Sequence, residues 1–193
     1  LPFALMLVAS FSSESSILRN GYTFTPDGLS LDSYLYLFSS SYNILKAYFV
    51  SAFVTILGTF LGLVLTISLA YPLSRTGMPG KNVIAFFVFF TMLFNGGLIP
   101  TYIMWTTVFS IKNTYAAYIL PNLLARAFYI MMMRTYFTTS IPESILESAR
   151  IDGASEFKIL LRIVLPLSKP ILVTVGLLIG IGYWNDWQNG LYY

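Results

Sequence analysis

Charged side chains are concentrated in one short stretch of an otherwise apolar chain. Residues 145–162, ILESARIDGASEFKILLR, contain Glu147, Arg150, Asp152, Glu156, Lys158 and Arg162. Acids interspersed with bases suit ion pairs with a complementary protein surface, whereas a membrane-anchoring helix needs bases alone. The sequence has no histidine and no cysteine. This excludes imidazole acid–base catalysis, thiol chemistry, disulfides and the commonest zinc sites, and we expect no catalytic residue and no metal site in this chain.

The residues around the charged stretch predict a helix that ends at a glycine. The pattern SIPE at 140–143 is typical of a capping box with proline in the first turn, so a helix is expected to begin at Ile141. Ile141, Ile145 and Ala149 would share one face of this helix. Gly153 would end it, because glycine adopts a left-handed C-cap without a Cβ penalty.

A second helix is expected after the glycine, with apolar residues at helical spacing: Phe157, Leu160, Leu161 and Val164. Pro166 and Pro170 should bend the path into the next apolar stretch. The two helices could simply anchor their neighbours at the membrane surface, with the bases meeting lipid phosphates. The rigid cap and the glycine turn favour instead a shaped protrusion that a partner protein grips.

The composition indicates a membrane protein. Hydrophobic residues make up 56% of the 193 residues and charged residues only 10%, well below the content of a soluble domain. Because lipid leaves no water to satisfy the backbone, the long uncharged runs must be helices. We expect spans at 43–72, 82–108, 113–135 and 167–189, and the end of another span at 1–11. The chain is expected to be a fragment at both ends.

The lysines and arginines indicate the orientation of these spans. Arg75 and Lys81 lie in one connection, and five more bases lie in or beside residues 140–166. The positive-inside rule therefore places 140–166 in the cytoplasm and the polar loop 12–41 outside. A net charge of +3, spread along the chain, gives no indication of nucleic acid as a partner.

Two glycine patterns interrupt the predicted spans. Gly58 and Gly62 lie on one helix face, which in membranes indicates close helix packing. The segment FNGGLIP at 94–100 contains Asn95, Gly96, Gly97 and a proline, which would kink the helix and free backbone carbonyls. Such a break is tolerated where protein or a water-filled path satisfies those carbonyls. It is therefore either a packing kink or part of a solute path.

Polar residues near the ends of the later spans are further candidates for a solute path. Arg126 would cost about 2.5–3.5 kcal/mol at a span centre, so it should face the bundle, line the path or reach an interface. The stretch after residue 182 combines aromatic rings with amide and carboxylate groups, as sugar binding requires: Tyr183, Trp184, Asn185, Asp186 and Trp187. Aromatic residues also gather at membrane interfaces, so an interfacial belt is the alternative.

The charged stretch resembles a known motif. Glu147-Ser148-Ala149, then Gly153 and Ile163-Val164-Leu165-Pro166 after a further nine residues, is similar to the EAA loop of permease subunits of ATP-binding-cassette (ABC) importers, with Ser148 in place of alanine. The continuation through Asp152 and Ala154 resembles the carbohydrate branch. FNGGLIPTY at 94–102 and GYWNDWQNGLYY at 182–193 resemble its LplC/YtcP-like subgroup of oligosaccharide permeases.

This resemblance implies an all-α polytopic bundle of the MetI-like permease type in the bacterial plasma membrane. Residues 1–193 would form a single permease domain that lacks most of the first span and all of the sixth. The first loop helix would couple to an ATPase. The coupling residues carried over from the motif are Glu147, Ser148, Ala149, Asp152, Gly153, Ala154 and Pro166.

The resemblance also implies the partners of the chain. These are a second, different permease subunit that would form a heterodimer with this chain, two ATPase subunits, an extracellular solute-binding protein and membrane lipid. No phosphate-binding GxxxxGK[ST] loop is found in the sequence, so ATP and Mg²⁺ would bind to the ATPase partners and this chain would hold no cofactor.

Two other function classes have weaker support in the sequence. An ion-coupled secondary transporter would use the break at 94–100 and Arg126, but should contain several carboxylates in its spans, where only Asp186 is a candidate. An ABC permease for a solute other than sugar is the nearer alternative. An intramembrane enzyme has no plausible catalytic group in the spans.

Overall fold

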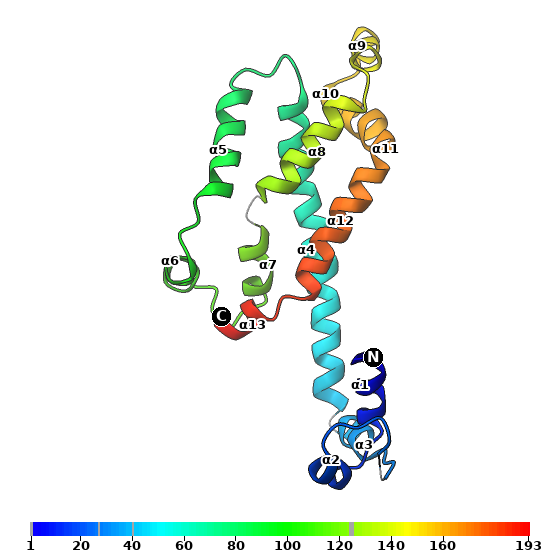
Figure 1. Ribbon diagram of the computed structural model, residues 1–193. Helices are drawn as coiled ribbons and strands as arrows, with labels where there is room; N and C mark the ends of the chain where they lie inside the picture. The colour runs from blue at the N-terminus through cyan, green and yellow to red at the C-terminus, as the bar shows by residue number, and fades with distance from the viewer. Residues whose placement is uncertain (1, 27, 40, 124–125) are drawn as a thin grey trace. The chain divides into compact units, whose positions relative to one another are not determined.

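The computed structural model describes residues 2–26, 28–39, 41–123 and 126–193, and its regular elements are helices. An isolated antiparallel bridge joins Ser12 and Leu29. In chain order (Figure 1) the helices are α1 Pro2–Ser10, α2 Glu14–Asn20, α3 Asp32–Ser39, α4 Ser41–Ser74, α5 Lys81–Leu93, α6 Leu98–Ile103, the π-helix η1 Met104–Val108, α7 Ala116–Leu123, α8 Ala127–Thr139, α9 Glu143–Ile151, α10 Glu156–Ile159, the π-helix η2 Leu160–Val164, α11 Leu165–Leu167, α12 Lys169–Trp184 and α13 Gln188–Tyr192.

The chain forms two compact units, residues 1–50 and 51–193. In the first unit, the segment predicted to be a polar loop contains the short helices α2 and α3. Ser13 caps α2 by accepting a hydrogen bond from the Ser16 amide, which stabilises a helix too short to form alone. The Tyr34 hydroxyl donates to Ser10 Oγ at 2.8 Å and thereby fastens α3 to α1.

The predicted spans after residue 41 correspond to one long helix and three bent helix pairs. Within the described residues, only the helix at 42–74 is by itself long and apolar enough to cross a membrane, and up to four spans result if each bent pair counts as one. The pair α5 and α6–η1 bends by 113°, and the pair from α10 to α13 bends by 84° near Ser168. The kink expected at 94–100 is therefore a complete break of the helix.

A seam of glycines joins α4 to α12. A Cβ on Gly58 would lie 2.5 Å from the Tyr183 ring, and one on Gly62 would lie 3.2 Å from Ile179. From the other side, a Cβ on Gly180 would lie 3.2 Å from the Thr59 hydroxyl. The two helices approach each other this closely because these positions carry no side chain, which confirms the packing role predicted for Gly58 and Gly62.

Candidate functional site

The first loop helix, α9, begins later than its sequence pattern predicts. It starts at Glu143, with Pro142 in an extended conformation at the N-cap and no side-chain cap, while Ser140 ends α8. The prediction of a start at Ile141 was wrong because the proline at 142 disfavours helical geometry at the residue before it. The Glu143 carboxylate is instead used in tertiary ion pairs.

The end of α9 confirms the predicted glycine cap. Gly153 has φ +77°, its amide donates to the Arg150 carbonyl, and the Ala154 amide donates to the Ala149 carbonyl, both at 3.0 Å. These two bonds form a Schellman motif. A Cβ at Gly153 would meet no atom within 4 Å, so glycine is required there by backbone conformation and not by space.

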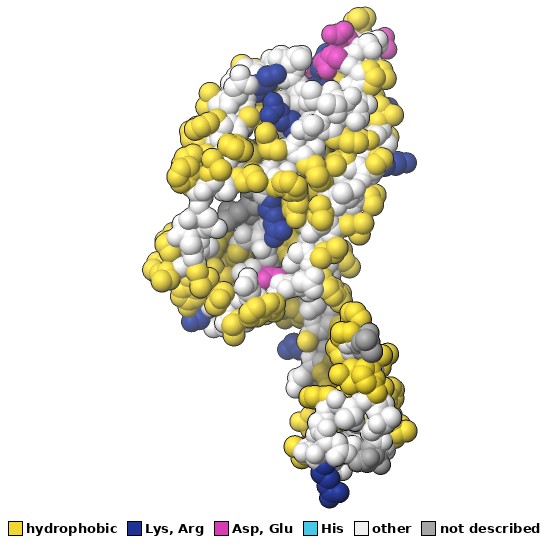
Figure 2. Space-filling model, viewed as in Figure 1, with side chains coloured by type: hydrophobic (Ala, Val, Ile, Leu, Met, Phe, Trp, Pro, Cys, Tyr) yellow, Lys and Arg dark blue, Asp and Glu magenta, His cyan; other side chains and the backbone are white. Residues whose placement is uncertain are grey.

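The faces of α9 differ from the predicted amphipathic pattern in one respect. Leu146 is fully buried and Ile141 nearly so, whereas Ile145 is exposed and Ile151 is 86% exposed. Leu146 is therefore an internal anchor and is unavailable to a partner. Figure 2 shows acidic side chains at the end of the second unit where α9 lies.

The remaining motif residues of the loop lie mainly on its outer surface. Ala149 and Ala154 are half-buried. The others are exposed: Glu147, Ser148, Asp152, Gly153 and Pro166. The structure thus gathers the predicted coupling residues on one loop, and their role in docking stays a prediction.

The second loop helix contains a π-turn that changes its buried face. Ser155 caps α10 by accepting from the Lys158 amide, and the helix continues through η2. Ile159 and Val164, five residues apart, are both fully buried, while Phe157 is 70% exposed and Leu161 is also exposed. The predicted α-helical spacing was wrong at Phe157 and Leu161, because a π-turn advances five residues per hydrogen bond.

A network of charged side chains ties the loop to the end of α4. Arg75 NH1 lies 3.2 Å from Glu143 Oε2, Arg150 NH1 lies 3.0 Å from Glu143 Oε1, and Arg150 Nε lies 2.7 Å from Glu156 Oε1. The Tyr71 hydroxyl donates to Glu156 Oε2 at 2.5 Å. We call these five residues the loop network. Hydrogen bonds from Arg150 to Glu156 and Glu143 raise the pKa of Arg150 above its usual value.

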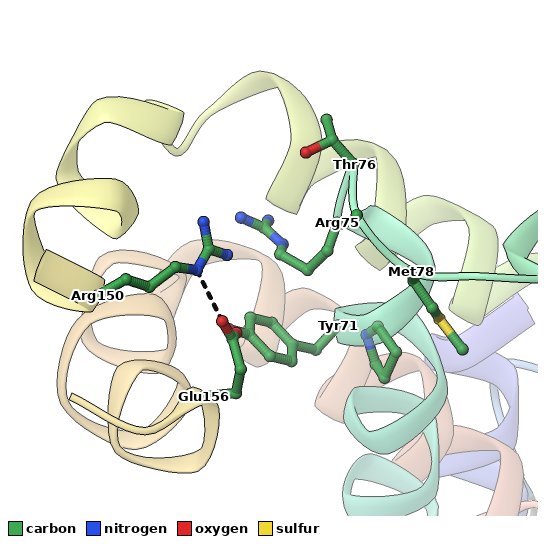
Figure 3. Close-up of a pocket in the computed structure, with 8 residues that line it drawn as sticks. Tyr71, Arg75, Thr76, Met78, Arg150 and Glu156 are labelled. Carbon is green, nitrogen blue, oxygen red and sulfur yellow. Dashed lines mark hydrogen bonds and ion pairs between the residues drawn. The ribbon is translucent and has the colours of Figure 1, made fainter. Parts of the chain in front are cut away.

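A cavity of about 430 Å³ lies beside the loop network. Figure 3 shows Arg75, which follows α4, and Arg150 of α9 reaching toward the same space, with Glu156 and the Tyr71 ring below them. Thr76 and Met78 also line the cavity. Sequence reasoning missed Tyr71 and Arg75 as members of this site. They are separated from their carboxylate partners by 85 and 68 residues, and no local pattern connects them.

A second polar cluster surrounds Asp186, near the other end of the same unit. Asp186 Oδ2 accepts from the side-chain amides of Asn122 at 2.6 Å and Asn189 at 2.7 Å, and Oδ1 accepts from the Asn189 backbone amide at 3.2 Å. Arg126 donates to Asn122 Oδ1 at 3.3 Å and lies over the Tyr129 ring. The predicted path residues Arg126 and Asp186 are thus linked through Asn122, which sequence reasoning did not identify.

The other predicted path residues are not all equally accessible. Tyr183 is 4% exposed and donates its hydroxyl to the Ile119 carbonyl, whereas Trp184 and Trp187 are exposed. Asn185 is also exposed. The break at Asn95, Gly96 and Gly97 is exposed too, and Asn95 Oδ1 accepts the Gly97 amide at 2.9 Å, which helps the chain to turn.

Bent apolar helices, a glycine seam and a charged loop at one end are typical of a helical membrane protein. Residues 58–187 match the family described as binding-protein-dependent transport system inner membrane component. The chain belongs to this family, which confirms the family predicted from the loop motif. It is a family of ABC transporter permeases, which are non-catalytic membrane subunits.

Relatives and a solved structure resemble the chain over nearly all its length. It is 37% identical to Protein LplC and 38% identical to the polygalacturonan/rhamnogalacturonan transport system permease protein YtcP, both of Bacillus subtilis (strain 168), in each case over 100% of this chain. The chain spans 64% and 66% of those proteins, slightly less than two thirds. A bacterial ABC transporter involved in the import of the acidic polysaccharide alginate matches with a TM-score of 0.84 and 31% identity, over 96% of this chain and 65% of that one. The predicted all-α permease fold is thereby confirmed.

Proposed function

We propose that this chain is a membrane-spanning permease subunit of an ATP-driven, binding-protein-dependent sugar importer, with oligosaccharides as the substrate class. The observation that carries the proposal is α9, a capped helix of nine residues with Ile145, Glu147 and Ser148 exposed and a glycine turn at its end. Membership of the permease family and the sugars named in the relatives' descriptions support it.

In this proposal α9 is a coupling helix that sits in a cleft of a partner ATPase. Closure of two ATPase subunits around ATP and Mg²⁺ moves the loop and, through it, the spans. Glu147 pairs with a basic residue of the ATPase, but an exposed ion pair contributes only about 0–1 kcal/mol. Burial of the exposed Ile145 and Ile151 side chains then supplies most of the binding free energy.

The remaining parts of the chain have corresponding roles. Loop 140–166 faces the cytoplasm and segment 12–41 faces outward in a multi-pass arrangement in the bacterial plasma membrane, consistent with the positive-inside rule. A second permease subunit completes the solute path, and a solute-binding protein delivers the sugar. The exposed Trp184 and Trp187 rings are suited to stack on sugar rings at the outer end of that path.

Transport by the reconstituted complex tests this function. The full-length protein, its second permease, its ATPase subunits and its binding protein are placed in liposomes, and uptake of labelled oligosaccharides is measured with ATP inside. We expect ATP-dependent uptake that Glu147→Lys abolishes without preventing assembly. Gly153→Val should also abolish uptake, because a β-branched residue is strained at φ +77°, whereas the matched Gly153→Asn should retain it.

The alternatives predict different outcomes of the same measurement. Uptake driven by an ion gradient without ATP would overturn the proposal in favour of a secondary transporter. The sequence gives that class little support, because an ion-coupled transporter should have several carboxylates in its spans and Asp186 is the one candidate. Competition by amino acids or peptides and not by sugars would reassign the substrate class.

A further inference from the structure

The loop network connects residues 71–75, at the end of α4, with residues 143–156 of the loop. Tyr71 belongs to the last turn of α4, Arg75 follows α4, Glu143 and Arg150 occupy the first and last turns of α9, and Glu156 begins α10. Each carboxylate is shared by two donors from different elements. The loop is therefore held at both ends of α9 and at the start of α10.

The network is most buried where it meets the spans. The side chain of Arg75 is 8% exposed, those of Glu143 and Arg150 are 35% and 34% exposed, and that of Glu156 is 54% exposed. A buried cation that loses its carboxylate is strongly unfavourable, whereas an exposed pair contributes little. Glu143 is consequently the member whose removal should release α9 from the spans.

Arg75 also belongs to a reciprocal pair of helix caps. Its NH2 donates to the Phe137 carbonyl in the last turn of α8 at 3.1 Å, and Arg134 of α8 donates to the Leu73 carbonyl in the last turn of α4 at 3.0 Å. Each arginine satisfies a carbonyl that lacks a partner within its own helix and lies at the negative end of that helix. The ends of α4 and α8 are thereby joined before Arg75 reaches the loop.

We propose that Arg75 and Glu143 are positioning residues that fasten α9 to the joined ends of α4 and α8, so that force applied to α9 moves both spans together. This inference rests on the proposed coupling function of α9. Neither residue touches the partner; both act by fixing the orientation of the helix that does.

Apolar packing alone would not give this result. Leu146 and Ile141 anchor α9 by burial, but burial is non-directional and leaves the helix free to rotate about its anchor. The hydrogen bonds to Glu143 and Arg150 restrict that rotation because they depend on geometry. Without them, α9 would still dock but would follow the ATPase without moving α4 and α8.

Two readouts on the assembled transporter in liposomes test the proposal: ATPase stimulation by sugar-loaded binding protein, and hydrogen exchange of the amides of 143–151. In Glu143→Gln we expect stimulation to fall about tenfold with the ATPase subunits still bound. Exchange in 143–151 should rise about fivefold while exchange in α12 stays unchanged. Glu14→Gln, the same chemical change in α2, should behave like the unmodified protein.

Two further variants distinguish the proposed role of Arg75 and Glu143 from a general folding defect. Arg75→Lys keeps the charge but can replace only some of the three hydrogen bonds that Arg75 makes to Ser74, Glu143 and Phe137. In both readouts its value should therefore lie between those of the unmodified protein and Glu143→Gln. Glu156→Gln, at the exposed end of the network, should have a smaller effect than Glu143→Gln.

The possible failures are distinguishable. Normal stimulation in Glu143→Gln, or lost stimulation without faster exchange in 143–151, would overturn the fastening role. If the unmodified complex shows no sugar-stimulated ATPase activity at all, the proposed function fails. In that case the exchange measurement alone still decides whether Glu143 fastens α9.

Discussion

The loop network around Arg75 and the cluster around Asp186 lie toward opposite ends of the second unit and are built from different groups (Figure 1). The loop network balances two arginines with two carboxylates. The Asp186 cluster satisfies one carboxylate with amide groups of Asn122 and Asn189. Among the described residues, Arg126 forms no ion pair with Asp186 and reaches it only through Asn122.

The difference follows from access to water. At the loop, Glu143, Arg150 and Glu156 remain partly exposed, so their charges keep much of their hydration. Asp186 is half-buried in the turn between α12 and α13, where an uncompensated charge would be unfavourable. The first arrangement joins a surface loop to the end of α4 through ion pairs, and the second surrounds one half-buried carboxylate with amide groups.

The largest expected effect is the loss of the buried member of the loop network. Arg75→Ala leaves the Phe137 carbonyl uncapped and removes one partner of Glu143, so the free energy of unfolding should fall by about 3 kcal/mol. Unfolding by SDS in mixed micelles measures this. The exposed Lys112→Ala is the matched control and should change stability by less than about 0.5 kcal/mol. If both variants lowered the free energy of unfolding equally, Arg75 would contribute no more to stability than an exposed lysine.

Overpacking the glycine seam should perturb the Asp186 end instead. Gly58→Ala forces a Cβ to within 2.5 Å of the Tyr183 ring, three residues before Asp186, and should destabilise the protein by about 2 kcal/mol. Gly77→Ala, where no atom lies within 4 Å, should be nearly neutral in the same assay. A neutral Gly58→Ala would show that Tyr183 can move aside freely.

Removing the charge of the second cluster should have a smaller effect. Asp186→Asn weakens the bonds from Asn122 and Asn189 and should lower the free energy of unfolding by about 1.5 kcal/mol. Asp186→Glu keeps the charge on a longer side chain and serves as the comparison. If Asp186→Asn stabilised the protein, the Asp186 carboxylate would lower the free energy of unfolding and would be present because transport requires it.

The smallest effect should be that of the exposed pair. A double-mutant cycle on Arg150 and Glu156 should give a coupling free energy of about 0.5 kcal/mol, and about half of it should be lost between 0.05 and 0.5 M NaCl. The bond between Asn122 and Asp186 should be insensitive to the same salt. Equal salt responses at the two ends would contradict the difference in water access.

The sequence predicted those features that depend on neighbouring residues. Gly153 and the motif after Glu147 identified α9 and its cap, because a C-cap is a local structure. The start of α9 was placed two residues early because Glu143 resembles a capping residue in the sequence but forms its ion pairs with Arg75 and Arg150. The π-turn at η2 could not be predicted from the sequence, because no residue type specifies it.

Features created by tertiary contact could not be predicted. Arg75 was recognised only as a base in a connection, because its partners Phe137 and Glu143 are more than sixty residues away. No sequence pattern pointed to Asn122 either, because its partner Asp186 is also distant in the sequence. The break after Leu93 was anticipated from its glycines, but its extent was not, because composition gives no bend angle.

The loop network has one further consequence. Its two arginines and two glutamates are joined in a chain of ion pairs whose charges sum to zero, so its field falls off rapidly with distance. On α9 and its cap, the charges left outside this chain of ion pairs are Glu147 and Asp152, and both are exposed. A macromolecule diffusing toward this helix therefore meets an anionic face, and a cationic cleft would be attracted to it over roughly 10 Å at 0.1 M ionic strength.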